Sequence, residues 1–146
     1  NPMNALISFG NTLLYTKTIS QIYNTHLEQS ISFLHEPSEA RFSLSLDLSE
    51  VFKPVIVFRT IFDLVNNKKL KVEKHFEEKL NYSLLNEEGK KIFIEAFENR
   101  INQTFEHEKL NRKITYKQAI KLDGYKLIKF IMEGKEFIPF DLDKKE

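Results

Sequence analysis

The chain has 146 residues, of which 41% are hydrophobic and 29% are charged, and its formal net charge at pH 7 is +1. This length supports one compact core and is short for two ordinary domains. The absence of cysteine excludes disulfides and thiolate metal sites, so any metal must be held by His, Asp, Glu or water, which favours Mn²⁺ or Mg²⁺. No apolar run is long enough to span a membrane and no secretion signal is evident, so we expect a cytoplasmic protein without membrane partners.

The N-terminal segment is predicted to be a helix. Asn1 is a suitable N-cap and Pro2 suits the first helical position. Leu6, Phe9 and Leu13 then recur at roughly helical spacing. After this helix the periodicity fades.

A loop is predicted from His26 to Phe42, because Pro37 and several serines interrupt the apolar pattern there. This loop carries His35. Loops positioned by a rigid scaffold often carry the residues of functional sites.

The segment from 43 to 66 returns to helical spacing. Alternating leucines from 44 to 48 leave a strand possible locally, but the apolar pattern continues too far beyond them for a strand. Pro54 lies inside the predicted helix, where proline lacks an N–H and its ring clashes with the carbonyl of Glu50, four residues back. We therefore expect a kink beside Glu50.

The second half of the chain is predicted to contain two more long helices. After a loop at 66–71 and a charged segment to Tyr82 that can form a short helix, Asn86 is a candidate N-cap. Thr115 can cap the last helix, which should end near Gly134. The apolar stripe expected on the first of these helices consists of Phe93, Phe97, Ile101 and Phe105. We predict an all-α fold: a single helical domain of about four main helices plus short helices.

A metal site is one interpretation of three residues around the kinked helix. Asp47 and Glu50 are three residues apart, so both carboxylates should lie on one face of the helix. His35, on the preceding loop, would add an imidazole to give a mixed nitrogen and oxygen site. The ordinary interpretation is a solvated Glu50, an Asp47 that favours the first helical turn and an unremarkable loop histidine. Spacing alone favours the ordinary interpretation.

Charge is distributed unevenly along the chain. Residues 73–108 contain nine acids and five bases, whereas residues 109–129 contain seven bases and one acid. The basic stretch can face DNA phosphates or form a solvated lysine surface. Other catalytic patterns, including glycine-rich phosphate loops and His-Glu-x-x-His, are absent from the sequence. His26, His75 and His107 have no evident partners and receive no role.

Three motifs occur in an order that resembles the CRISPR-associated integrase family. The first is the segment 1–15, the second is Phe-Leu-His-Glu-Pro at 33–37, and the third is Phe-Ser-Leu-Ser-Leu-Asp-Leu-Ser-Glu-Val-Phe-Lys-Pro at 42–54. The resemblance continues through Leu-Asn-Glu-Glu-Gly-Lys at 85–90 and Lys-Leu-Asn-Arg-Lys at 109–113. It therefore extends over nearly the whole chain.

The resemblance implies a divalent metal site that performs DNA strand transfer by transesterification. In that family a helical C-terminal domain binds Mn or Mg through one Glu, one His and one further acid. His35 and Glu50 match the second and third ligands, and Asp47 resembles the nearby acid that supports the site. The first ligand, a Glu, has no match in residues 1–146. We therefore expect the C-terminal helical catalytic domain without the N-terminal β-rich domain, and an isolated chain without activity.

The resemblance also implies partners. These are duplex DNA (the spacer precursor and the repeat), a small homodimeric partner protein of the CRISPR adaptation complex, and a second copy of the full-length protein. The side chains expected to contact DNA phosphates are Arg41, Arg59, Arg112 and Lys113. Phe58 departs from the family, because relatives commonly carry an Asp at this position. The alternatives are a non-catalytic helical module that binds DNA or a partner and, ranked last, a metal phosphohydrolase acting on small nucleotides.

Overall fold

The computed structural model describes residues 1–23 and 38–133, and their fold is mostly helical, as predicted. The elements in chain order are α1 (Pro2–Tyr23), α3 (Ser38–Lys53), the π-helical turn η1 (Pro54–Phe58), α4 (Arg59–Asn66), α5 (Val72–His75), β1 (Phe76–Glu78), β2 (Ser83–Leu85), α6 (Glu87–Ile101), β3 (Thr104–His107), β4 (Arg112–Thr115) and α7 (Tyr116–Glu133). In this part of the chain no helix combines the length and apolar character needed to cross a membrane.

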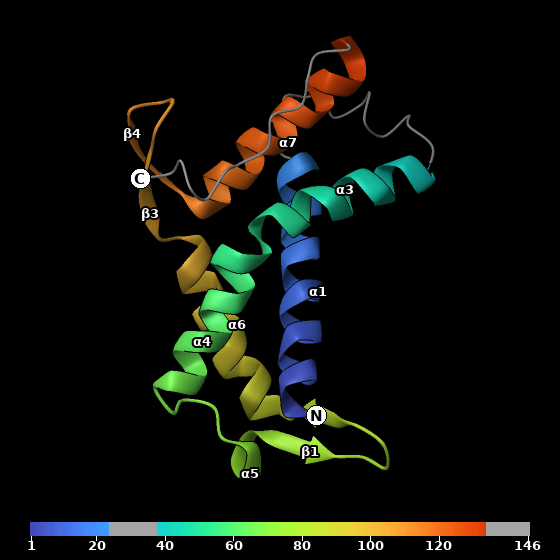
Figure 1. The fold of residues 1–146 in the computed structure, drawn as a ribbon, viewed down its shortest axis with the longest axis vertical. Helices are drawn as coiled ribbons and strands as arrows, with labels where there is room; N and C mark the ends of the chain where they lie inside the picture. The colour runs from blue at the N-terminus through green and yellow to red at the C-terminus, as the bar shows by residue number, and fades with distance from the viewer. Residues whose placement is uncertain (24–37, 134–146) are drawn as a thin grey trace.

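Helix α1 runs along the long axis of the molecule (Figure 1). It begins as predicted, because the Asn1 side-chain oxygen accepts a hydrogen bond from the Met3 backbone N–H at 2.9 Å. Buried residues recur every four positions along it, at Leu6, Gly10, Leu14, Thr18 and Ile22, and Gln21 is buried as well. The helix contacts α3, α6, α7, η1 and β2, so α1 is the central element of the core.

The predicted helix at 43–66 is confirmed and begins earlier, at Ser38. The helix is distorted at Pro54, as expected, but the distortion is a π-helical turn between α3 and α4, of which Pro54 is the first residue. The backbone N–H of Arg59 accordingly reaches the carbonyl of Pro54, five residues back. A wider turn absorbs the missing N–H and the ring clash without ending the helix.

Helix α6 begins at the predicted cap, where the Asn86 side-chain oxygen accepts a hydrogen bond from the Gly89 N–H at 2.8 Å. Phe93, Phe97 and Ile101 are buried as predicted. The prediction that Phe105 continues this stripe is wrong, since α6 ends at Ile101 and Phe105 lies in β3.

Two small antiparallel hairpins are the departure from a purely helical fold. Strand β1 pairs with β2, and β3 pairs with β4 so that Phe105 lies opposite Ile114. The chain turns between β3 and β4 at Asn111, whose φ of 52° is in the left-handed region that asparagine tolerates. The predicted short helix before Tyr82 is present as α5, but β1 follows it directly.

Helix α7 begins after the predicted cap. Thr115 Oγ1 accepts from the Gln118 N–H at 3.0 Å and Gln118 Oε1 accepts from the Thr115 N–H at 2.8 Å, which is a reciprocal capping box. Its buried apolar residues include Ala119, Ile120, Leu127 and Ile128, as predicted, and also Tyr116. The side chain of Ile131 lies outside the described residues.

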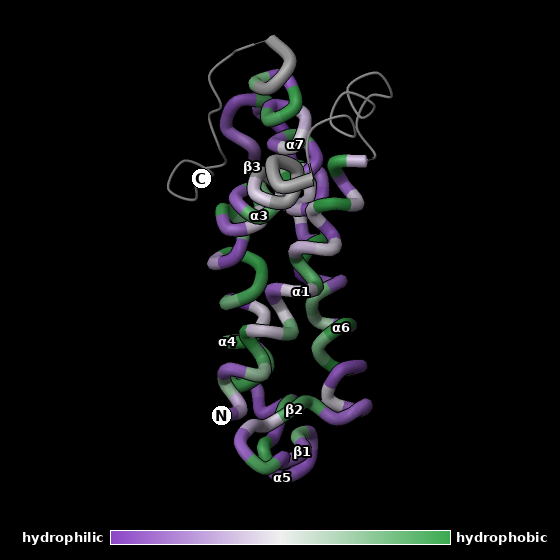
Figure 2. The backbone as a smooth tube through the Cα atoms, turned by 90° about the vertical axis from the view of Figure 1, so that its right-hand side faces the viewer, coloured by the Kyte–Doolittle hydropathy of each residue, from purple (hydrophilic) through white to green (hydrophobic). Residues whose placement is uncertain are grey.

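The core lies between α1, η1, α6 and α7. Its fully buried side chains include Phe52, Ile56, Phe93 and Phe97. Figure 2 shows hydrophobic and hydrophilic segments alternating along the helices, as expected when each helix buries one face. The β1–β2 hairpin lies at one end of the long axis, whereas α3, α7 and the β3–β4 hairpin lie at the other (Figure 1).

Candidate functional site

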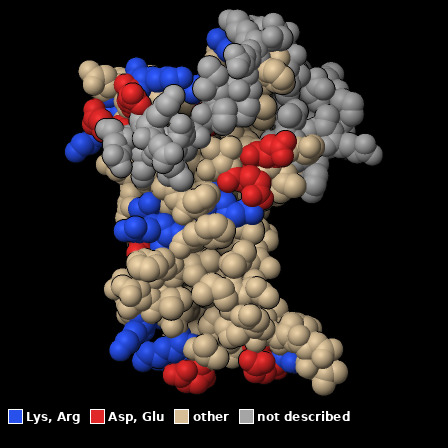
Figure 3. Space-filling model, in the orientation of Figure 1, with Lys and Arg blue, Asp and Glu red and all other residues tan. Residues whose placement is uncertain are grey.

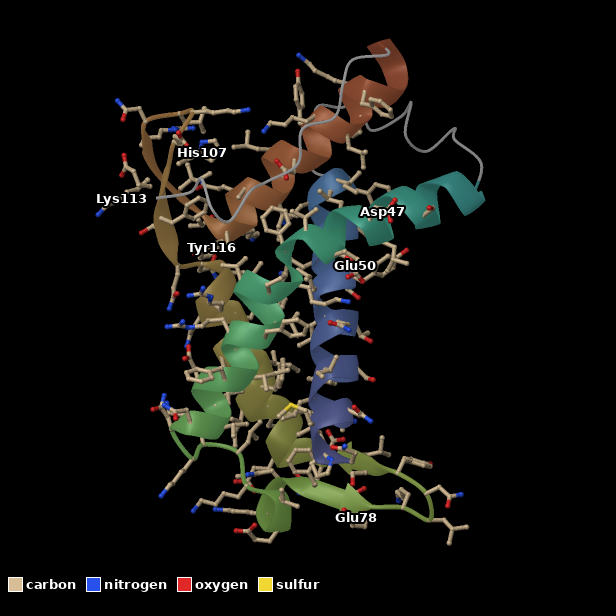
Figure 4. The ribbon with its side chains drawn as sticks, viewed as in Figure 1. Asp47, Glu50, Glu78, His107, Lys113 and Tyr116 are labelled. Carbon is tan, nitrogen blue, oxygen red and sulfur yellow. The ribbon has the colours of Figure 1, made fainter. Side chains whose placement is uncertain are left out.

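The acidic pair Asp47 and Glu50 lies on α3, with both side chains exposed to solvent. Leu48 and Ser49, between them in sequence, are buried and fix the face of α3 that turns toward the core. The two carboxylates are one helical turn apart and are shown together on α3 in Figure 4. The predicted shared position of these two side chains is therefore confirmed, but their role as metal ligands stays a prediction.

A lysine accompanies the acidic pair. Lys53 Nζ lies 2.6 Å from Glu50 Oε1, so it neutralises part of the local negative charge. Figure 3 shows acidic atoms where Figure 4 places Asp47 and Glu50, with basic atoms beside them. The pair faces solvent and so is accessible to an ion.

The remaining predicted ligand and one predicted DNA contact are not placed. His35 lies outside the described residues, and so does the side chain of Arg41. Within residues 1–23 and 38–133, no group of three or more His, Asp or Glu side chains is arranged to hold a metal ion. The described residues by themselves therefore do not form the predicted metal site.

Arg59, at the start of α4, interacts with its own helix. Its Nε lies 3.5 Å from Asp63 Oδ1, and its guanidinium lies 5.9 Å from the centre of the Phe62 ring. Both Arg59 and Asp63 are substantially exposed, so this pair contributes little to stability. Phe58, the departure from the family pattern, is 44% exposed on η1.

Arg112 and Lys113 are exposed on β4, in a hairpin that the sequence analysis did not predict. Adjacent residues of a strand point to opposite faces, so these two side chains do not share a surface. Arg112 pairs across the ladder with His107 and Lys113 with Glu106. In Figure 4 the hairpin is well separated from the acidic pair on α3.

Basic side chains surround His107. Burial lowers the pKa of its imidazole, and the positive charges of Lys126, Lys109 and Arg112 lower it further, while Glu108 opposes them. We call these four residues the basic hairpin surface: Lys109, Arg112, Lys126 and His107. The interpretation that His107 lacks a partner is wrong, since its Nδ1 accepts a hydrogen bond from the Leu110 N–H at 3.2 Å.

His75 also has partners that the sequence did not reveal. It is buried, and its Nδ1 accepts a hydrogen bond from the Lys71 N–H at 2.9 Å. Its Nε2 lies 3.7 Å from Glu88 Oε1. These contacts tie α5 to the start of α6, which indicates a structural role.

Arg100 is a residue that sequence reasoning missed. Its Nε donates a hydrogen bond to the backbone carbonyl of Val55, inside η1, at 2.7 Å. Its guanidinium also lies 4.9 Å from the centre of the Tyr116 ring. The only signal in the sequence is a charged residue directly beside the buried Ile101 at the end of α6, which is too weak to predict a contact 45 residues away.

Comparison with known proteins identifies the family. The model of the family described as CRISPR associated protein Cas1 matches residues 1–99, which include α3 and the acidic pair. This chain belongs to the Cas1 family.

Individual Cas1 relatives agree with this assignment. The chain is 50% identical over 140 residues to CRISPR-associated protein Cas1 1 of Methanobrevibacter ruminantium, covering 96% of this chain and 43% of that protein. It is 46% identical over 140 residues to CRISPR-associated endonuclease Cas1 3 of Thermodesulfovibrio yellowstonii, again covering 96% of this chain and 43% of the relative. The chain thus spans less than half the length of the curated relatives that it matches.

The fold also agrees with that of a solved Cas1 structure. A CAS1 protein from Thermotoga maritima superimposes with a TM-score of 0.74 and 45% sequence identity, covering 92% of this chain and 41% of that chain. The match corresponds to the C-terminal part of the relatives. The helical arrangement that carries Asp47 and Glu50 is therefore that of the Cas1 family.

Proposed function

We propose that this chain forms part of the centre of a metal-dependent DNA endonuclease and integrase, which inserts spacer DNA into a CRISPR array by transesterification. The observation that carries the proposal is the Cas1 family match over residues 1–99, the segment that holds Asp47 and Glu50. Relatives of similar sequence are named CRISPR-associated endonuclease Cas1.

The proposed metal is Mn²⁺ or Mg²⁺, held by His35 and Glu50 with Asp47 beside them and with a further Glu from outside this chain. The exposed carboxylates of α3 fit such an ion, because both metals prefer oxygen ligands. When bound, the ion would polarise the scissile phosphate and stabilise its developing negative charge.

The residues of the chain itself have electrostatic and positioning roles in this proposal. Asp47 and Glu50 concentrate negative charge on one face of α3. The positive charge of Lys53, whose Nζ lies 2.6 Å from Glu50 Oε1, reduces the repulsion between the two carboxylates. The basic hairpin surface attracts the phosphates of duplex DNA, with Arg112 as its most exposed strand residue. The remaining proposed DNA contacts are Arg41, Arg59 and Lys113.

The proposed assembly follows the family resemblance. We expect the full-length protein to be a cytoplasmic homodimer that binds the small homodimeric partner protein of the adaptation complex as well as duplex DNA. A non-catalytic module that binds DNA or a partner is the second candidate for the chain alone. It is favoured by the fact that residues 1–23 and 38–133 contain no group of three candidate metal ligands.

The proposal is tested by strand transfer in the full-length protein. DNA with a free 3′ hydroxyl is incubated with a repeat-containing plasmid and Mn²⁺, and joined products are counted for the parent, His35→Ala and Glu50→Gln. Both variants should lose at least about a hundredfold in rate because each removes a ligand, while their far-UV circular dichroism stays unchanged. Lys69→Gln, on the loop before α5, is the matched surface control.

Two outcomes would contradict the proposal. Joining at the parent rate by Glu50→Gln would mean that Glu50 is not a ligand. Joining or cleavage of DNA by the isolated chain would mean that no upstream ligand is needed, and Asp47 would then be the first candidate to replace it.

A further inference from the structure

Arg100, at the end of α6, contacts η1, the segment after α6 and the start of α7. Its Nε donates to the Val55 carbonyl in η1 at 2.7 Å, and its Nη1 donates to Gln103 Oε1 at 2.6 Å. Its guanidinium lies over the Tyr116 ring, 4.9 Å from the ring centre. One side chain at the end of α6 therefore contacts the π-helical turn and the first residue of α7.

The contact occurs at the π-helical turn between α3 and α4. Pro54 supplies no N–H to the carbonyl of Glu50, and the helix accommodates this by a π-helical turn. π-Helical turns inside α-helices are rare and frequently occur at functional sites. Helix α3 packs on α1 and α7, and the hydrogen bond from Arg100 adds a contact at the turn where α3 and α4 meet.

Arg100 is suited to hold this turn. Burial lowers the pKa of its guanidinium, but an arginine stays charged at every physiological pH. A hydrogen bond from a charged donor is about twice as strong as one between neutral groups. Thr60 Oγ1 adds a second side-chain contact inside the turn, 2.6 Å from the carbonyl of Ile56.

On the other side, Arg100 meets the base of the β3–β4 hairpin. Tyr116 is buried and stacks on Phe105 of β3, with ring centres 4.6 Å apart. The backbone N–H of Tyr116 bonds to the carbonyl of Gln103, whose side chain Arg100 also holds. The hairpin that carries Arg112 is thus fixed to the same guanidinium that contacts η1.

We infer that Arg100 is a positioning residue: it fixes the direction of α3, and so of Asp47 and Glu50, relative to the β3–β4 hairpin. The functional part of this inference rests on the proposed function, in which the acidic pair holds a metal and the hairpin holds DNA. Arg100 acts on the acidic pair and on the hairpin indirectly, through the carbonyl of Val55 and the ring of Tyr116.

The inference is tested first without metal or DNA. Spin labels are attached in the full-length protein to cysteines at the exposed positions Ser43 on α3 and Lys113 on β4, after any cysteines outside this chain are replaced. Pulsed electron–electron double resonance then gives the distribution of distances between the two labels. Arg100→Met, which keeps the length of the side chain but has no donor, should broaden or shift the distribution, and Arg100→Lys should restore it in part.

A matched control separates this effect from general loosening of α6. Glu98→Gln removes the partly buried contact between Glu98 and Lys17 of α1, 3.4 Å long, without touching η1. Its label distances should equal those of the parent. Distances in Arg100→Met that also equal those of the parent, with circular dichroism unchanged, would overturn the inference.

Mn²⁺ affinity provides the functional readout. We expect Arg100→Met to weaken binding by about tenfold, as is typical when a residue that orients metal ligands is removed, whereas Glu98→Gln leaves binding unchanged. If Glu50→Gln weakens Mn²⁺ binding but Arg100→Met does not, the positioning role is wrong. If Glu50→Gln has no effect either, the proposed metal site is wrong, and the label distances alone decide whether Arg100 fixes α3.

Discussion

The contact between α1 and α6 and the outer face of α3 differ in how tightly their side chains are constrained. At the first, a Cβ added to Gly10 would lie 2.6 Å from Val57 Cγ1 and 3.0 Å from Phe93 Cζ, so there is no free space. At the second, Asp47 and Glu50 face solvent, and Glu50 forms an ion pair with Lys53 at 2.6 Å. The residues that stabilise the fold therefore differ from those of the proposed chemistry. A substitution should be able to impair one property and leave the other unchanged.

Truncation of the core should have the largest effect on stability. Phe93 is fully buried and packs edge-on against Phe9, with ring centres 5.4 Å apart. Phe93→Ala should lower the free energy of unfolding by about 3–5 kcal/mol, measured by urea titration. Glu50→Gln should change it by no more than about 0.5 kcal/mol. Comparable losses in the two variants would show that the acidic face of α3 also supports the fold.

Adding one methyl group tests the same packing on a smaller scale. Gly10→Ala places a Cβ against the rigid side chains of Val57 and Phe93, and such overpacking costs about 1–3 kcal/mol. Gly124→Ala, on α7, is the control, since its Cβ would lie 3.2 Å from Ile22 Cγ1. The higher helix propensity of alanine, about 1 kcal/mol, favours both variants, but it should offset only the looser contact at Gly124. Equal unfolding free energies for the two variants would contradict this account of the core.

The two basic side chains of β4, Arg112 and Lys113, should differ in their contribution to DNA binding. Arg112 shares a face with His107, near Lys109 and Lys126, whereas Lys113 lies opposite Glu106 on the other face. In the full-length protein, Arg112→Ala should therefore reduce the slope of log affinity against log salt by about 1.

Lys113→Ala should change this slope less than Arg112→Ala does. Lys69→Ala, at the opposite end of the molecule, should leave it unchanged. DNA binding that is independent of salt, or a larger effect of Lys113→Ala, would assign the contact to another surface.

The smallest expected effect is the pH dependence that His107 contributes. Its pKa is lower in the folded protein than the ordinary value of about 6.5, so the unfolded chain binds the extra proton. The contribution of His107 to the free energy of unfolding is then fully present above about pH 6.5, and it falls as the pH drops through 6.5 toward the folded pKa.

The melting temperature between pH 5 and pH 8 measures this effect. In His107→Asn, which keeps an acceptor for the Leu110 N–H, the fall below about pH 6.5 should be smaller than in the parent. Bound DNA should raise the pKa of His107, since phosphate offsets the positive charges around it. An identical pH profile in the two proteins would mean that His107 does not contribute.

Features that depend on a few neighbouring residues were predictable. The caps at Asn1, Asn86 and Thr115 each bond to a backbone N–H two or three residues away, as expected from their sequence. The effect of Pro54 on its helix was predictable for the same reason, because the missing N–H and the ring clash are local. The position of Asp47 and Glu50 on one face follows from helical spacing alone.

Features that depend on distant partners were not. Phe105 continues the four-residue spacing of α6, yet it lies in a strand. Its backbone is part of the ladder in which it pairs with Ile114, and its ring stacks on Tyr116. The neighbours of His107 were hidden for the same reason, since Lys126 comes from α7. The metal role of His35 stays a prediction, because His35 lies outside the described residues.

The sequence by itself thus determined the long helices, their N-caps, the place where Pro54 distorts its helix and the shared face of the two carboxylates, since hydrogen bonds and steric clashes between near neighbours decide these. The tertiary structure alone decided where α6 stops, which face of the hairpin each base occupies, and that Arg100 reaches the carbonyl of Val55, 45 residues away. Such contacts form only when the buried apolar faces bring distant segments together, and the spacing of residues along the chain does not predict that packing.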